Sequence, residues 1–178
     1  MNARKLIIIG AGKYGREIED IAEQTHAYDD IKFLDDNATG QAIIGKCADI
    51  PLHVGSDVIF YVAFGDNDLR SKLIDQVQRA NGKLACIIHP SAYISPKAKI
   101  GQGVAIMPMA IVNTNTVIGL GCMINSGAIV DHDVILEPFV HVCVGAIVKA
   151  DNRVPEKMKI EAGYVVERDT YQYGAGGQ

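Results

Sequence analysis

The second half of the chain carries an aliphatic residue at every sixth position, and this repeat restricts the possible folds more than any other feature. A mostly small residue follows each aliphatic residue by four positions. This period cannot form one face of an α-helix, because a pitch of 3.6 residues would scatter the positions around the helix. It fits short strands separated by turns and stacked into a three-sided solenoid. The aliphatic series is Ile88, Ile94, Ile100, Ile106, Val112, Ile118, Ile124, Val130, Leu136, Val142 and Val148.

Glycine or asparagine often follows the aliphatic residue, as at Gly101, Asn113, Gly119 and Asn125. Both residue types tolerate a positive φ angle better than other residues do. We therefore expect them at the corners of the coils, with positive φ.

The first half has a different pattern, which begins with the segment KLIIIGAGKYGREIEDIAEQ. Four aliphatic residues predict a buried strand, and the turn Gly10-x-Gly12-x-x-Gly15 leads into a helix. Such glycines let the backbone approach a pyrophosphate, and the helix N-terminus offers free N–H groups. A second strand, 31–34, ends at Asp35 and Asp36. Further predicted elements are a strand that begins DVIFYV, a helix from about residue 69 to 79, and a strand KLACII that enters the solenoid.

A glycine turn with an acid at the position of Asp35 is typical of NAD-binding folds. A complete dinucleotide domain needs roughly 120 to 150 residues, and only about 85 precede the repeat. We therefore favour one nucleotide or nucleotide sugar over NAD. A third possibility is a glycine turn that only lets a helix pack closely on the sheet.

Charge and composition exclude several partners. A formal net charge of -4, a pI of about 5.7 and the absence of a long basic cluster give no basis for nucleic-acid or anionic-membrane binding. The apolar run at 6–9 is too short for a membrane span or a signal peptide. Four cysteines without CxxC spacing predict free thiols, no zinc site and a cytoplasmic location: Cys47, Cys86, Cys122 and Cys143.

The segment IGQGVAIMPMAIVNTNTVIGLGCMINSGAIV resembles the hexapeptide-repeat acyltransferases. The resemblance implies a left-handed β-helix that forms a homotrimer, with active sites between subunits. The segment GAIVKADNRVPEKMKIEAG resembles one that closes such helices, so we expect Val154 and Ile160 in a closing segment and not in another coil. The tail YQYGAGGQ is expected to be flexible.

The motifs GAGKYGRE, FLDD and FGDNDLR, joined through HPSA to a β-helix with an HD pair, together resemble bacterial nucleotide-sugar acetyltransferases. That group includes bacillosamine-type and perosamine-type N-acetyltransferases and sialic acid O-acetyltransferases. The resemblance implies a Rossmann-like α/β half domain that binds the nucleotide sugar and a shortened left-handed parallel β-helix that binds acetyl-CoA. The expected domains are 1–85, 86–165 with the closing segment, and the tail 166–178.

One corner of the solenoid carries the chemistry we consider most informative. The run 100–130 has no Asp, Glu, Lys or Arg, and Asp131, His132 and Asp133 follow it. His132 lies two positions after the inward Val130 and should point outward. Imidazole suits a general base near neutrality, and an adjacent carboxylate can orient it. The resemblance implies that His132 is the base and Asp133 its partner, whereas an ordinary solvated turn is the alternative.

The resemblance implies further contacts. Those expected for acetyl-CoA are His141, which should point outward between Val140 and Val142, Asn125, for which a structural role is equally expected, and Gly145. Those expected for the nucleotide sugar are Gly10, Gly12, Lys13, Tyr14, Asp35, Asp36, Asp66, Asn67 and Arg70. No metal is required.

These expectations combine into one hypothesis with two alternatives. The chain would transfer an acetyl group from acetyl-CoA to an amino group, in preference to a hydroxyl, of a nucleotide-linked amino sugar used for surface glycans. Members of the family usually continue for one or two more coils before closure. The first alternative is therefore a non-catalytic trimeric scaffold or nucleotide-sugar sensor that has lost the CoA site. The second is an NAD-binding module.

Overall fold

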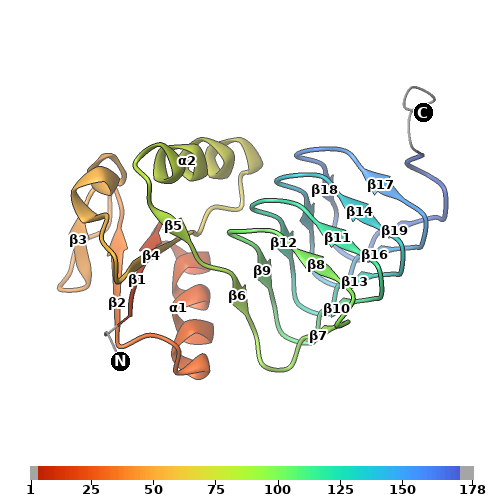
Figure 1. Ribbon diagram of the computed structural model, residues 1–178, viewed down its shortest axis with the longest axis horizontal. Helices are drawn as coiled ribbons and strands as arrows, with labels where there is room; N and C mark the ends of the chain where they lie inside the picture. Colours follow the sequence, from red (N-terminus) through yellow and green to blue (C-terminus); the bar gives the residue numbers. More distant parts are fainter. Residues whose placement is uncertain (1–3, 173–178) are drawn as a thin grey trace. The chain divides into compact units, whose positions relative to one another are not determined.

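The computed structural model describes residues 4–172, and the chain divides into two units between His89 and Pro90. The first unit is a parallel five-stranded sheet in the order β3-β2-β1-β4-β5, with α1 and α2 on opposite faces (Figure 1). Its strands are β1 (Lys5–Ile9), β2 (Asp30–Leu34), β3 (Ile43–Gly45), β4 (Val58–Val62) and β5 (Lys83–Leu84). Its helices are α1 (Lys13–Thr25), the 3₁₀ helix η1 (Cys47–His53) and α2 (Asn67–Arg79).

The central strand explains the aliphatic run at the start of the chain. β1 pairs with β2 on one edge and β4 on the other, and its residues 6–9 are buried on both faces of the sheet. Helix α1 buries Ile18, Ile21 and Ala22 against the sheet, on the face expected from the sequence. Helix α2 begins at Asn67, two residues before the predicted start, because the Asp66 carboxylate accepts a hydrogen bond from the Leu69 N–H at 2.7 Å and caps the helix.

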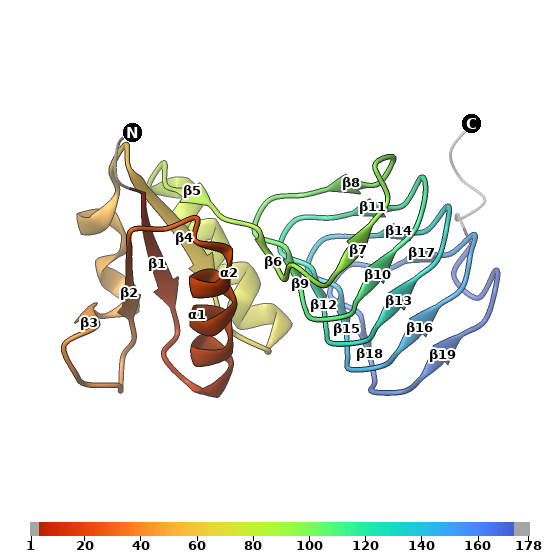
Figure 2. The same ribbon diagram turned by 90° about the horizontal axis from the view of Figure 1, so that it is seen from below.

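The second half is the predicted solenoid, built from two-residue strands in three parallel sheets (Figure 2). Each strand pairs with the strand eighteen residues away, as Val130 does with Val112 and Val148. One sheet contains β6 (Ile87–Ile88), β9 (Ala105–Ile106), β12 (Met123–Ile124), β15 (His141–Val142) and β18 (Lys159–Ile160). The next contains β7 (Tyr93–Ile94), β10 (Ile111–Val112), β13 (Ile129–Val130), β16 (Ile147–Val148) and β19 (Val165–Val166). The third contains β8 (Lys99–Ile100), β11 (Val117–Ile118), β14 (Ile135–Leu136) and β17 (Arg153–Val154).

The two inward positions of the hexad are confirmed. From Ile106 onward every aliphatic position of the series is buried, and so are the small residues between them, from Ala110 to Ala146. The solenoid interior is therefore a mainly apolar column, as the six-residue period predicts.

The expected closing segment is wrong. β17, β18 and β19 pair with β14, β15 and β16, so the coils continue through Val166. Asn152 occupies the small inward slot of the continued repeat and is buried. Its amide donates to the Lys149 carbonyl at 2.8 Å and the Glu167 carbonyl at 2.9 Å, which satisfies a polar group that would otherwise be costly to bury.

Positive φ occurs at a different hexad position from the one expected. It falls on the third residue after the aliphatic position, as at Asn115 (59°) and Asp133 (56°). Gly101 and Gly119 serve close stacking of the coils, because a Cβ on Gly119 would lie 2.7 Å from the Pro138 nitrogen. Asparagine and aspartate tolerate the left-handed region better than most residues, so two polar side chains can occupy these corners cheaply.

The end of the described chain packs onto the last coil. The Tyr171 N–H donates to the Asn152 side-chain oxygen at 2.8 Å, and the Tyr171 carbonyl accepts from the Arg153 N–H at 2.8 Å. Residues 173–178 of the expected flexible tail lie outside the described residues.

Several kinds of site are not found in residues 4–172. No helix in this range is long and apolar enough to cross a membrane. The same range holds no group of three or more His, Cys, Asp or Glu residues placed to bind a metal ion. The four cysteines are free thiols.

Candidate functional site

The corner between β13 and β14 presents a histidine held by a carboxylate. His132 Nδ1 lies 2.8 Å from Asp133 Oδ2, and the two side chains are 45% and 46% exposed. Asp131 holds the backbone at the same point, because its Oδ1 accepts the His132 N–H at 2.8 Å. The structure thus brings together the two residues that the sequence predicts as base and partner.

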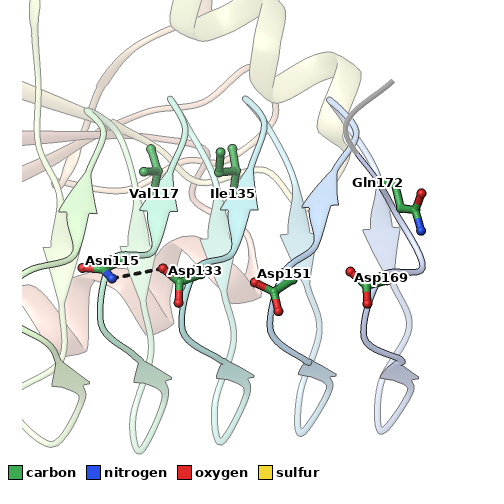
Figure 3. Close-up of a pocket in the computed structure, with 7 residues that line it drawn as sticks. All are labelled: Asn115, Val117, Asp133, Ile135, Asp151, Asp169 and Gln172. Atoms are coloured by element: carbon green, nitrogen blue, oxygen red, sulfur yellow. Dashed lines mark hydrogen bonds between the residues drawn. The ribbon is translucent and has the colours of Figure 1, made fainter. Parts of the chain in front are cut away.

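Asp133 is itself fixed from the preceding coil. Asn115 Nδ2 donates to Asp133 Oδ1 at 3.0 Å (Figure 3), and the Asp133 N–H donates to the Thr114 carbonyl at 3.1 Å. One carboxylate oxygen therefore faces the imidazole while the other is occupied by an amide.

The electrostatics of this corner favour a basic imidazole. The hydrogen bond to Asp133 raises the pKa of His132 above its ordinary value, and the charges of Asp131, Asp133 and Asp151 act in the same direction. Hydrogen bonds from His132 and Asn115 lower the pKa of Asp133, so this carboxyl group stays ionised. A carboxylate at Nδ1 selects the tautomer with hydrogen on Nδ1, which leaves the Nε2 lone pair to accept a proton.

A hollow of about 650 Å³ runs along this corner over several coils. Three aspartates at equivalent corner positions of successive coils, Asp133, Asp151 and Asp169, form one side of it, as Figure 3 shows. Val117 and Ile135 give it an apolar wall. The hollow therefore offers, beside Asp133, a surface that is acidic on one side and apolar on the other.

The residues expected to contact acetyl-CoA lie at other positions on the coil. His141 is on β15, between Met123 and Lys159 of neighbouring strands, and is only 8% exposed, so it is not an ordinary surface histidine. Asn125 and Gly145 belong to the corner between the β12/β15 sheet and the β13/β16 sheet. Within one chain, this corner and the His132 corner are separated by a sheet of the solenoid.

The structure distinguishes among the three glycines of the first turn. Gly10 has a φ of 102°, and a Cβ there would lie 2.9 Å from the Phe64 ring. A Cβ on Gly15 would lie 2.0 Å from the Gly10 carbonyl oxygen, so both residues are required by the fold. A Cβ on Gly12 would meet no atom within 4 Å, and this glycine begins a helix without a side-chain cap. Gly12 alone leaves room for a ligand at the backbone.

The two acids after β2 each accept backbone N–H groups from other segments, and Asp35 does so at this turn. Asp35 Oδ2 accepts the Ala11 N–H at 2.7 Å, and this bond is the main cause of its lowered pKa. Its Oδ1 accepts the N–H groups of Asn37 and Ala38. Asp36 Oδ1 accepts the Cys47 N–H at 2.9 Å. Both carboxylates therefore have structural roles, and any ligand contact would use their remaining lone pairs.

Lys13 and Tyr14 differ in their exposure to solvent. Lys13 is exposed at the first residue of α1. The Tyr14 hydroxyl lies 2.8 Å from the Tyr61 hydroxyl on β4, and burial raises the pKa of both phenols, that of Tyr61 to about 12. Lys13 is therefore the better placed of the two for an anionic ligand.

The residues after β4 that are expected to contact the nucleotide make hydrogen bonds within their own loop. Arg70 is fully buried and donates to the Phe64 carbonyl at 2.9 Å and to Asn67 Oδ1 at 2.7 Å. Asp66 caps α2. The three side chains of Asp66, Asn67 and Arg70 are directed at the chain itself, so any effect of Arg70 on a ligand would pass through the loop.

The sequence interpretation gave Asn113 only a role at a corner and did not name Asn115. They lie eighteen residues before Asp131 and Asp133, and Asn113 Nδ2 donates to Asp131 Oδ1 at 3.1 Å. The signal was available, because three hexads make one coil and residues eighteen apart must stack.

Comparison with known proteins gives concordant matches. The model of the PglD N-terminal domain family matches residues 5–77. The acetyltransferase domain of PglB from Neisseria gonorrhoeae FA1090 superposes with a TM-score of 0.90 at 34% identity, covering 93% of this chain and 83% of that one. The same domain in complex with acetyl coenzyme A also matches with a TM-score of 0.90, at 33% identity, covering 94% and 83%.

Two further relatives are more distant or cover less of the chain. PerB from Caulobacter crescentus, in complex with CoA and GDP-perosamine, matches with a TM-score of 0.71 at 26% identity, covering 95% of this chain and 91% of that one. A UDP-N-acetylbacillosamine N-acetyltransferase of Bacillus subtilis (strain 168) is 39% identical over 51 residues, which is 29% of this chain. That match spans 24% of the length of the Bacillus protein.

Proposed function

Because this chain belongs to the bacterial nucleotide-sugar acetyltransferase family, we propose that it transfers an acetyl group from acetyl-CoA to an amino group of a nucleotide-linked amino sugar. The observation that carries the proposal is the His132 imidazole, exposed on the β-helix with Nδ1 bound to Asp133 at 2.8 Å. A base in this state can accept a proton through Nε2 near neutral pH.

The proton balance assigns a role to each group of the pair. The sugar amine attacks the thioester carbonyl, a C–N bond forms, and His132 Nε2 accepts the proton that the amine loses. The C–S bond then breaks, and the proton passes to the leaving thiolate. Asp133 stabilises the imidazolium that exists between these events, since its carboxylate stays ionised.

We further propose that the working enzyme is a homotrimer with the site between subunits. Two observations support it. His132 and the corner that contains Asn125 and Gly145 lie on different corners of the coil, so a second copy could supply the CoA contacts. Large apolar side chains are exposed at the Asn125 corner and on the adjacent sheet, namely Met109, Val144, Tyr164 and Tyr93. A single chain would leave such surface in contact with water.

The first unit is proposed to hold the nucleotide at the start of α1. Gly12 leaves the backbone approachable, Lys13 is exposed beside it, and the helix N-terminus favours a negatively charged phosphate. Asp35 borders the same turn through its bond to Ala11, and Asp36 follows it in the sequence. We propose a cytoplasmic enzyme that prepares amino sugars for surface glycans, in keeping with its free thiols.

The two alternatives are less well supported. A scaffold that had lost its CoA site was suggested by early closure of the β-helix, but the coils continue through Val166. The matched relatives are acetyltransferases, which favours neither the scaffold nor an NAD-binding module.

The test is an assay for thiol released from acetyl-CoA, run with UDP-, dTDP- and GDP-linked 4-amino-4,6-dideoxy sugars and with a sialic acid. We expect release that depends on one amino sugar, and a product with one added acetyl group by mass spectrometry. Protein that binds a nucleotide but releases no thiol with any member of the panel would overturn the proposal in favour of the scaffold.

A further inference from the structure

The corner that carries His132 stacks on the equivalent corner of the preceding coil. Asn113 and Asn115 lie beneath Asp131 and Asp133, and each amide donates to the carboxylate of the aspartate above it, at 3.1 and 3.0 Å. Figure 3 shows the Asn115–Asp133 pair at equivalent positions of adjacent coils. The base is therefore flanked by two carboxylates, each bound by an uncharged donor from the preceding coil.

The Asn115 contact is the one that reaches the imidazole. Asp133 uses Oδ2 for His132 Nδ1 and Oδ1 for Asn115 Nδ2. Its side chain is 46% exposed, and the terminal torsion of an aspartate is broad, so an unheld carboxylate would rotate. The Asn113–Asp131 pair acts on the backbone N–H of His132 instead.

We propose that Asn115 is a positioning residue for acetyl transfer: its amide holds the Asp133 carboxylate so that Oδ2 faces His132 Nδ1. The inference rests on the proposed function, because it requires His132 to act as the base. Asn115 touches neither substrate nor the proton in transit and acts only through Asp133.

A change at Asn115 has a definite electrostatic consequence. Removal of its amide frees the Asp133 carboxylate to turn away from the imidazole, and the hydrogen bond to Asp133 is the main cause that raises the pKa of His132. The pKa of His132 should then fall toward its ordinary value. The other charged groups that act on His132 are Asp131 on its own corner and Asp151 on the following coil, and Asp151 is paired with Arg168. Neither changes in an Asn115 variant.

Two substitutions separate the amide from the backbone conformation. Asn115→Gly removes the donor and accepts the φ of 59° without strain. Asn115→Asp keeps the size and tolerates the same φ, but it replaces the donor with a second carboxylate. Lys157→Gly is the matched control, because Lys157 has the same φ of 59° at the equivalent position of another corner.

Two readouts are needed, and one of them does not depend on turnover. The pH dependence of kcat/KM reports the pKa of the base in the free enzyme. An NMR titration of the imidazole signals, with His132→Ala identifying the signal of residue 132, reports the same group without substrate.

For Asn115→Gly we expect kcat to fall about ten-fold, a part of the roughly 10²–10⁴-fold that a positioned base contributes. The KM for the sugar should hold, and both pH readouts should move downward as the bond to Asp133 is lost. Asn115→Asp adds a negative charge beside the pair and should move them upward instead, whereas Lys157→Gly should leave them at the wild-type position.

The outcomes distinguish the two proposals. A wild-type titration of His132 in Asn115→Gly would overturn the positioning role, even with turnover reduced. If Asn115→Gly does not fold, an unmoved titration in Asn115→Asp overturns it equally, since a carboxylate at this distance must act on Asp133. Full turnover in His132→Ala would instead remove the proposed function, while the titration would still decide whether Asn115 acts on His132.

Discussion

The backbone of the His132 corner and the backbone of the glycine turn in the first unit are held in place in opposite ways. At the corner, the backbone is fixed by strands that pair with the coils before and after, and the polar side chains are half exposed. In the first unit, side chains hold the backbone: Asp35 accepts the Ala11 N–H at the turn, and the buried Arg70 donates to the Phe64 carbonyl in the loop after β4.

This difference indicates where function can change without cost to the fold. In the solenoid, hexads and pairing determine the shape, so corner residues are free to carry chemistry. In the first unit, most residues of the nucleotide motif are needed by the loops they belong to. Substitutions at the corner should therefore affect turnover, and substitutions at the turn should affect stability.

The largest effect should come from His132→Ala. Turnover should fall about 10²–10⁴-fold, the usual contribution of a positioned general base. The melting temperature should stay near that of the wild type, because the side chain is half exposed. Thiol release and thermal unfolding measure the two quantities. His53→Ala, at the end of η1, is the control and should keep full turnover. If His132→Ala lost stability as well as turnover, the corner residue would have a structural role, and the contrast with the glycine turn would fail.

The reverse pattern is expected for Gly15→Ala. The added Cβ would lie 2.0 Å from the Gly10 carbonyl oxygen, a backbone atom that cannot move aside. We expect a loss of about 3 kcal/mol or more in the free energy of unfolding, at the upper end for overpacking. Urea unfolding followed by circular dichroism measures it. A stable variant would show that the turn can relax, and that its glycine is not required by the fold.

A third, smaller effect concerns pH. The bond to Asp133 raises the pKa of His132, so more of the base is protonated in weak acid than for an ordinary histidine. Asp133→Asn keeps a residue that tolerates the φ of 56° but removes the charge. The acid limb of kcat/KM should then move to lower pH, while the maximum falls because the imidazolium has lost its partner. An acid limb that stays in place would show that another group controls it.

The sequence was sufficient for the features that repeat or that depend on burial alone. The hexads predicted the solenoid, and the aliphatic run predicted β1. It failed at the end of the solenoid, where the resemblance of GAIVKADNRVPEKMKIEAG to a closing segment was given more weight than the six-residue spacing of Val154 and Ile160. The coils continue there, and Asn152 satisfies its amide inside them.

The candidate site could be predicted only in part, because some of its contacts join residues that are far apart in the sequence. The pair His132 and Asp133 is adjacent in sequence and was found directly. Asn115 acts across coils, and only the eighteen-residue spacing indicates it. Arg70 and Tyr14 were expected at a ligand, but their hydrogen bonds are made within the fold, and a motif alone cannot separate these roles.

The sequence motif does not distinguish among the three glycines of the turn. The smallest of the predicted effects, that of Gly12→Ala, would distinguish Gly12 from the other two. Gly12→Ala should fold, at a cost of less than about 1 kcal/mol for alanine at this helix start. Nothing lies within 4 Å of its added methyl group, which would instead occupy the space of a phosphate. We expect about ten-fold weaker binding of UDP or GDP by calorimetry, equivalent to about 1.4 kcal/mol. Unchanged affinity would place the nucleotide elsewhere. Saturable binding of NAD in preference to UDP would restore the dinucleotide interpretation, because Asp35 already lies at the spacing that such folds use.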